Sequence, residues 1–251
     1  MRRDQISLQL YTVREETARD MPGTLRKISE IGYPAVEFAG YGGLTAQYVK
    51  TILDDLGLRT SGVHVPLTAW ETNPETVLAD METLECAHAV LPMVPAGRRE
   101  DEASVAKLAE DLNRWGELCR CEGVAFSYHN HDFEFAPLGT TTMWDVLVRE
   151  TEPEIVGLEL DLYWIKYAGT DPETALRDVA DRVSLVHLKD MAPDDTLSDL
   201  PVGEGTLPWT TLLEAADAAG VEWFIAEQDN PGDALEDVKT SLQHLQGLAG
   251  P

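Results

Sequence analysis

YTVREETARDMPG, residues 11–23, separates two fold classes. It follows the first predicted strand and contains neither a GxGxxG turn nor a GKS or GKT sequence. An open doubly wound sheet usually has such a glycine-rich phosphate turn at this point. The composition of this stretch therefore favours the other fold built from alternating strands and helices, a closed (β/α)8 barrel.

Eight short apolar runs predict parallel strands that alternate with helices. They cover residues 6–11, 35–40, 59–65, 87–94, 124–130, 156–162, 183–190 and 223–229. Helical periodicity between the runs ends at glycines, among them Gly32 and Gly57. Because eight strands close a barrel, we expect residues 1–251 to form a single (β/α)8 domain of the α/β class.

The composition excludes several classes of partner. The chain has 251 residues, with 45 Asp and Glu against 19 Lys and Arg and a formal net charge of −26. A surface this negative repels phosphate backbones and anionic lipid heads, so we expect neither nucleic acid nor a membrane as partner. The sequence contains no long apolar run and no signal-peptide core, which predicts a cytoplasmic protein. It is also compatible with a homo-oligomer.

Ionisable side chains gather at the carboxyl ends of the predicted strands, where the active site of a (β/α)8 barrel lies. Asp161, His187 and Glu227 belong to three successive strand ends. Convergent buried carboxylates are unfavourable without a cation. Carboxylates combined with an imidazole suit Mn²⁺, Mg²⁺, Co²⁺ or Zn²⁺, and we place Mn²⁺ first. The sequence therefore predicts a divalent metal ion at these strand ends.

Other polar residues at the strand ends are candidates for catalysis and substrate binding. The segment SYHNHDFEF, residues 127–135, ends the fifth predicted strand and enters a predicted active-site loop. Lys189 and His131 are candidate proton carriers. The candidate substrate contacts are Tyr11, Glu37, His64, His129 and Asn130. His64 by itself would more often be a core residue, because lone inward histidines usually are.

Five runs carry a family resemblance. They are YHNHDFEF (128–135), ELDLYWIKYAGTDP (159–172), VHLKD (186–190), VGEGTLPW (202–209) and WFIAEQD (223–229). Together they resemble the xylose isomerase-like TIM-barrel superfamily, in particular its sugar phosphate isomerase/epimerase branch, which also includes ketose 3-epimerases, inosose dehydratases and enzymes acting on 3-keto-glycosides. The resemblance spans essentially the whole chain. It implies a divalent ion held by Glu, Asp, His and Glu from strands five to eight, the last three being Asp161, His187 and Glu227.

The fifth strand departs from that family pattern. Ser127 stands where the ketose epimerases have the metal-binding Glu, and Asn130 and His131 stand where Asn-Arg would follow. Glu134 is the first glutamate after this point and is the expected fourth ligand, with His129 and His131 as alternatives. The pair of glutamates that acts as acid and base in the ketose epimerases is therefore incomplete here, which weakens the epimerase assignment, and Glu134 and Glu227 are the candidate catalytic glutamates.

Trp164 stands where epimerases place a substrate-binding histidine. An aromatic wall at that position suits a pyranose or cyclitol ring, so Trp164 joins the candidate substrate contacts. Basic residues near the strand ends are few, which favours a neutral small-molecule sugar or cyclitol over a sugar phosphate.

Two classes of function remain. The first is an isomerase or epimerase that removes a proton next to a metal-polarised carbonyl of a sugar, keto-sugar or cyclitol, or a lyase of the inosose dehydratase or 3-keto-glycoside type that begins with the same step. The second is a non-catalytic sugar-binding barrel. The convergent charges of Asp161, His187 and Glu227 favour the enzyme, since a scaffold does not need them.

Overall fold

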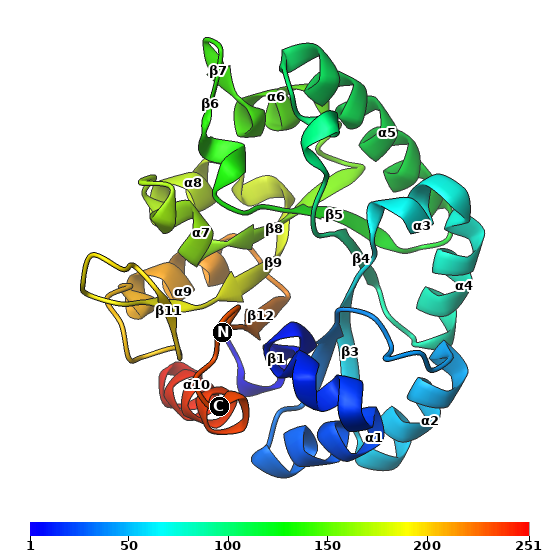
Figure 1. The fold of residues 1–251 in the computed structure, drawn as a ribbon, viewed down its shortest axis with the longest axis vertical. Coiled ribbons are helices and arrows are strands. Elements are labelled where there is room, and N and C mark those ends of the chain that lie inside the picture. The colour runs from blue at the N-terminus through cyan, green and yellow to red at the C-terminus, as the bar shows by residue number, and fades with distance from the viewer. Residues whose placement is uncertain (251) are drawn as a thin grey trace.

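Eight parallel strands form a closed barrel in this computed structural model, which confirms the predicted fold (Figure 1). The structure describes residues 1–250, so the last residue of the expected domain lies outside the described part. The strands are β1 (Ile6–Gln9), β2 (Ala35–Phe38), β3 (Arg59–His64), β4 (His88–Leu91), β5 (Ala125–His129), β8 (Val156–Asp161), β9 (Val183–Leu188) and β12 (Trp223–Ala226). They neighbour one another in chain order, and β12 pairs with β1 to close the barrel.

Each barrel strand lies inside its predicted run, and every run extends beyond its strand at the carboxyl end. In β12 the ladder stops at Ala226, although the predicted run continues to Asp229. Glu227 still donates its backbone N–H to the carbonyl oxygen of Leu188 at 3.1 Å, and Glu227 and Asp229 line a cavity at this end of the barrel. Residues at the strand ends therefore belong to both the sheet and the candidate site, so the sequence pattern does not show where each strand ends.

Within residues 1–250, ten α-helices surround the barrel (Figure 1). They are α1 (Arg14–Ile31), α2 (Ala46–Leu56), α3 (Leu67–Thr72), α4 (Pro74–Thr83), α5 (Glu102–Cys121), α6 (Met143–Glu150), α7 (Leu162–Tyr167), α8 (Pro172–Asp178), α9 (Trp209–Ala218) and α10 (Ala234–Leu248). Gly32 and Gly57 end α1 and α2 with φ of 111° and 67°, a left-handed conformation that glycine adopts without steric strain. No helix within residues 1–250 is long and apolar enough to cross a membrane.

The barrel interior changes from apolar to polar along its axis. Val90, Leu185 and Ile225 form a small apolar cluster inside the barrel. Alternation then places His187 on the same face as Leu185, one step nearer the carboxyl end, and Glu227 one step beyond Ile225. The larger apolar core lies between the strands and the surrounding helices. The apolar cluster thus closes the lumen below the polar strand ends.

Candidate active site

Four buried side chains bring their metal-ligating atoms together at the carboxyl end of the barrel. His129, Asp161, His187 and Glu227 place these atoms within 4.8 Å of one another. They come from β5, β8, β9 and the residue after β12, which are consecutive neighbours around the barrel. Asp161, His187 and Glu227 are the three ligands predicted from the strand ends. The fourth member, His129, was an alternative to Glu134.

Glu134 does not belong to this group. Its Oε1 accepts a hydrogen bond from the Tyr128 hydroxyl at 2.7 Å, and its Oε2 accepts one from the backbone N–H of His131 at 2.8 Å. Burial raises the pKa of Glu134 to about 7. One oxygen is thus bound by Tyr128 on β5 and the other by the backbone that follows β5, so His129, and not Glu134, completes the group that could hold a metal ion.

A lysine ammonium lies against the candidate ligands. Nζ of Lys189 is 2.9 Å from Asp161 Oδ2 and 2.7 Å from both Glu227 Oε2 and Asp229 Oδ2. Burial alone would lower the pKa of Lys189, but these three carboxylates raise it well above its ordinary value. Lys189 is therefore an ammonium at neutral pH, able to donate a proton or to stabilise negative charge but not to act as a base.

The site contains more carboxylates than cationic groups. Its carboxylates are Glu37, Glu159, Asp161, Glu227 and Asp229, and its cationic or readily protonated groups are Lys189, His64 and His187. Burial raises the pKa of Asp161 to about 6, against the opposing effect of Lys189. Burial and the neighbouring Glu159 raise the pKa of Glu37 to about 7. A further cation would relieve this excess of negative charge.

The four converging residues fit a divalent ion. Two imidazoles and two carboxylates provide the mixed nitrogen and oxygen donors that suit Mn²⁺, Co²⁺ or Zn²⁺ better than a soft thiolate metal. All four side chains are buried, so an ion there would be shielded from bulk water on the barrel side. The cofactor class expected from the sequence is therefore compatible with the residues present.

Glu37 lies beneath the ligand group and is not in contact with the cavity. Its Oε2 accepts a hydrogen bond from Gln9 Nε2 at 2.8 Å and lies 2.7 Å from His187 Nε2. Gly62 on the neighbouring strand leaves room for it, because a Cβ at that position would come within 2.3 Å of Glu37 Oε1. The sequence predicted Glu37 as a substrate contact, whereas the structure places it below His187 with no exposed surface.

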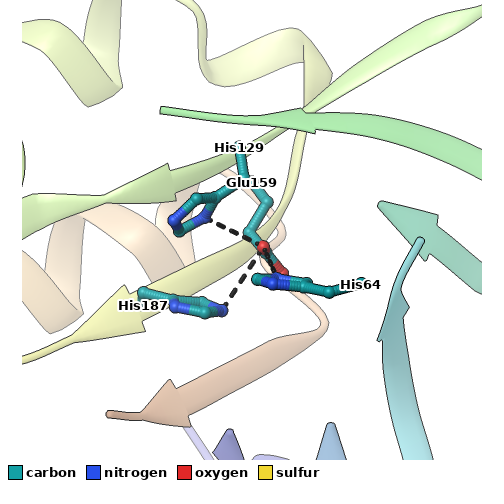
Figure 2. A group of neighbouring side chains, drawn as sticks. All are labelled: His64, His129, Glu159 and His187. Atoms are coloured by element: carbon teal, nitrogen blue, oxygen red, sulfur yellow. Dashed lines mark hydrogen bonds and ion pairs between the residues drawn. The ribbon is translucent and has the colours of Figure 1, made fainter. Parts of the chain in front are cut away.

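Glu159 is the residue that sequence reasoning left without a role. One of its oxygens, Oε2, faces three histidines at once (Figure 2). Burial alone would raise the pKa of Glu159, but His187 and His64 hold it well below its usual range. The signal for it was present in LELDL, where Glu159 shares the inward face with Asp161.

A cavity of about 710 Å³ opens above the ligand group. It is lined by six of the predicted site residues, Tyr11, His64, His129, His131, Trp164 and Glu227, and by the apolar side chains of Pro66, Pro92, Met93 and Phe133. Burial and then Lys189 lower the pKa of His131 to about 4, so its imidazole is neutral at pH 7. The volume lies in the range of small-molecule sites.

Asn130 has a different place from the one expected. Its Oδ1 accepts a hydrogen bond from the backbone N–H of Asp161 at 3.0 Å, and its Nδ2 donates to the carbonyl oxygen of Asp161 at 3.4 Å. The side chain has no exposed surface. Asn130 thus ties the end of β5 to the end of β8 and fixes the backbone that carries Asp161, instead of facing a substrate.

Comparison with known proteins agrees with the barrel fold. A family model described as xylose isomerase-like TIM barrel matches residues 25–248. The chain is 33% identical over 164 residues to an inosose dehydratase from Geobacillus thermodenitrificans, which is 56% of this chain and 54% of that protein. It is 29% identical over 167 residues to an inosose dehydratase from Bacillus cereus, 57% of this chain and 55% of that protein. The matches thus span about half the length of these curated relatives.

The fold is shared with solved structures of lower sequence identity. A sugar phosphate isomerase/epimerase from Parabacteroides distasonis superposes with a TM-score of 0.83, at 22% identity and with 96% of each chain covered. At that identity the likeness concerns the fold alone.

Proposed function

Because the chain belongs to the xylose isomerase-like TIM barrel family, we propose that it is a divalent-metal-dependent enzyme that removes a proton next to a carbonyl of a sugar, keto-sugar or cyclitol. The observation that carries this proposal is the buried group of His129, Asp161, His187 and Glu227, whose ligand atoms lie within 4.8 Å of one another. Two of the four, His129 and Glu227, also line the cavity. We further propose Mn²⁺ as the resident ion and residues 1–251 as one domain.

The chemistry divides between the ion and the side chains around the cavity. The ion, when bound, would polarise the substrate carbonyl and so acidify the neighbouring C–H. His131 is the proposed proton acceptor, because its imidazole is neutral and its buried Nδ1 has no hydrogen-bond partner within residues 1–250. Lys189 is the proposed proton donor, because its three carboxylate neighbours keep it protonated.

Glu227 is a second proposed acceptor. Burial alone would raise its pKa, but Lys189 and His187 hold it well below the usual range, so its carboxylate is ionised. Trp164 and Tyr11 supply aromatic surface on the cavity wall, which suits the apolar face of a pyranose or cyclitol ring. Glu37, Asn130 and Glu134 have no place in this proposal as substrate contacts or proton carriers.

The fate of the substrate after proton removal separates two candidate reactions. Return of a proton to a neighbouring carbon or to the opposite face gives isomerisation or epimerisation. Loss of a β-hydroxyl, assisted by the ammonium of Lys189, gives dehydration. The curated relatives named inosose dehydratase favour the second outcome. A barrel that binds a sugar without turning it over is the remaining alternative.

Two measurements on the purified protein test the proposal. Elemental analysis should find about one divalent ion per chain. Incubation of the loaded protein with keto-sugars and inososes in D₂O should give deuterium exchange at the carbon next to the carbonyl. Isomerisation keeps the substrate mass apart from the exchanged deuterium, whereas dehydration removes one water. A protein that binds no divalent ion, or one that is loaded and exchanges no proton in any substrate, would contradict the proposal.

A further inference from the structure

A layer of carboxylates lies beneath the proposed ligands and contacts their histidines. Figure 2 shows Glu159 Oε2 at the centre of His64, His129 and His187. Its distances are 2.7 Å to His64 Nε2, 3.0 Å to His129 Nδ1 and 3.3 Å to His187 Nε2. Glu37 adds a second carboxylate, 2.7 Å from His187 Nε2. Neither glutamate has exposed surface, and neither lines the cavity.

In each proposed histidine ligand, one ring nitrogen faces the lower carboxylates and the other faces a proposed carboxylate ligand nearer the cavity. His187 Nε2 faces Glu37 and Glu159, while its Nδ1 is 2.8 Å from Oε2 of the proposed ligand Glu227. His129 Nδ1 faces Glu159, while its Nε2 is 3.9 Å from Oδ2 of the proposed ligand Asp161. A proton on the lower nitrogen leaves the upper lone pair free for a metal ion.

The same lower group could instead be taken for a second metal site, because ligand atoms of His64, His129, Glu159 and His187 also lie within 4.8 Å of one another. Filling both sites would take up both ring nitrogens of His129 and of His187. Each ring would then have to lose both of its protons and become an imidazolate, which is strongly unfavourable for a neutral imidazole. Carboxylates that accept the lower N–H groups avoid this, so the geometry favours one ion with a layer of acceptors beneath it.

We propose that Glu159 and Glu37 are positioning residues, which hold His129 in its Nδ1–H form and His187 in its Nε2–H form so that the opposite nitrogens bind the metal. The inference rests on the proposed function, because it needs His129 and His187 as ligands. His64 completes the layer by donating to the same oxygen of Glu159. Carboxylates in this role orient the ring and increase the basicity of the ligand nitrogen.

Metal affinity tests this role without any activity assay. In the full chain, Glu159→Gln should bind Co²⁺ about 10- to 100-fold more weakly than the wild type, since an uncharged amide oxygen is a weaker acceptor for the ring N–H groups than a carboxylate oxygen. Glu37→Gln should weaken Co²⁺ binding in the same direction through His187 alone. The dissociation constants come from competition with a coloured chelator, and the visible Co²⁺ spectrum reports any change in ligand geometry. Unchanged or tighter binding in both variants overturns the proposal.

Asp190→Asn provides a matched control. Asp190 is also a buried carboxylate, but it accepts hydrogen bonds from Trp209 Nε1 at 2.7 Å and from the backbone of Gly203 at 2.9 Å, away from the ligand group. Its replacement should lower the melting temperature and leave the Co²⁺ affinity at the wild-type value. An equal loss of affinity in Asp190→Asn and Glu159→Gln would mean that general destabilisation, and not ring positioning, weakens the site.

An NMR measurement on the wild-type chain tests the proposed protonation of the two histidine rings even if the variants do not fold. In the Zn²⁺-loaded protein, ¹⁵N chemical shifts of the ring nitrogens should show His187 with a proton on Nε2 and His129 with a proton on Nδ1. The reversed pattern in either ring overturns the proposal. Failure of the proposed function looks different, because the wild type itself would then bind neither Co²⁺ nor Zn²⁺.

Discussion

Both ends of the barrel pair histidine with acids, but the two ends differ in how far the acids are buried. At the amino end, a cavity of about 470 Å³ is lined by Lys50, His88, Glu85 and Glu222 among others. His88 Nε2 lies 3.4 Å from Glu222 Oε2, and Lys50 Nζ lies 3.1 Å from Glu85 Oε2. The acids there are in water, with side chains 59% exposed for Glu222 and 79% exposed for Glu85.

At the carboxyl end the same residue types are enclosed. Asp161 and Glu159 have no exposed surface, and Glu227 is almost completely buried. Exposed ion pairs are screened and contribute about 0–1 kcal/mol each. The acids at the amino end are therefore stable in water without a further cation. Buried carboxylates must find a cation or a proton. The comparison teaches that burial, more than the number of charged residues, distinguishes a group that could hold a metal ion from a polar surface.

Replacing one histidine at each end of the barrel by alanine should give the largest difference between the two ends. His187→Ala removes a ligand that bridges Glu37 and Glu227, so the purified variant should contain almost no divalent ion. His88→Ala removes a buried histidine of the amino end and should retain about one ion per chain. Elemental analysis after gel filtration measures both. Equal metal content in the two variants would remove the distinction between the two ends.

Replacing one lysine at each end of the barrel should lower the turnover rate only at the carboxyl end. Lys189→Met should lower turnover by about 10² to 10⁴, the usual contribution of a general acid or base. The metal should stay bound, because Lys189 is not one of the four proposed ligands. Lys50→Met at the amino end is the control and should leave turnover unchanged. Rates of deuterium exchange into the substrate that the wild type accepts give the comparison, and a Lys189→Met protein with wild-type rates would exclude Lys189 as proton donor.

Removal of the ion should destabilise the carboxyl end. Binding at a free-ion concentration of 100 times Kd stabilises the folded chain by about 2.7 kcal/mol. For a chain of this size that corresponds to a fall in melting temperature of roughly 5–10 °C when a chelator removes the ion. The effect should disappear in His187→Ala, which has no ion to lose. A melting temperature that does not respond to proven metal removal would argue against a buried site.

Metal affinity should weaken as the pH falls. Burial alone would lower the pKa of His187, but Glu159, Glu227 and Glu37 raise it well above its ordinary value, so a metal ion must displace a proton from its Nδ1. One displaced proton makes Kd rise about tenfold per pH unit as the pH is lowered. Below pH 6 the carboxyl of Asp161, with a pKa of about 6, adds a second proton and steepens the slope. Titrations with Co²⁺ between pH 8 and 5 should show both slopes; a Kd independent of pH would rule out His187 as ligand.

Glu134→Gln should have the smallest effect of the series on metal binding. The carboxylate of Glu134 accepts one hydrogen bond from the Tyr128 hydroxyl on β5 and one from the backbone N–H of His131, and an amide can keep one of them. The Co²⁺ affinity should therefore stay at the wild-type value, whereas His129→Ala should lose the ion. If Glu134→Gln strips the metal and His129→Ala does not, the fourth ligand is the one expected from the sequence and not the one that the geometry indicates.

The barrel was predictable because period-two runs and glycine stops recur along the whole chain. The last three candidate ligands followed from alternation, since Asp161, His187 and Glu227 sit on inward faces of strands that end at the same rim. The fourth candidate ligand, from the fifth strand, could not be predicted in the same way. Whether Glu134 or His129 reaches the site depends on how the chain turns after Asn130, and Tyr128 and the backbone of His131 decide that turn through contacts that no spacing rule contains.

The depth of Glu37 was also hidden from the sequence. Strand alternation tells which side of β2 faces inward, but not how far down the lumen a long side chain lies. That depth depends on the stagger between neighbouring strands, and the register between β2 and β3 shifts between Val36 and Glu37. Glu37 therefore ends below His187 and outside the cavity.

Gly62 links the buried position of Glu37 to a sequence pattern that related chains would share. A methyl group at that position would overlap the carboxylate of Glu37, so Gly62 can be replaced freely only after Glu37 has changed, whereas Glu37 can be lost while the glycine remains. Among descendants of a common ancestor, glutamate at 37 should therefore occur only together with glycine at this position. A larger side chain there would let a genome survey identify relatives that have replaced the lower carboxylate, before any of them is purified.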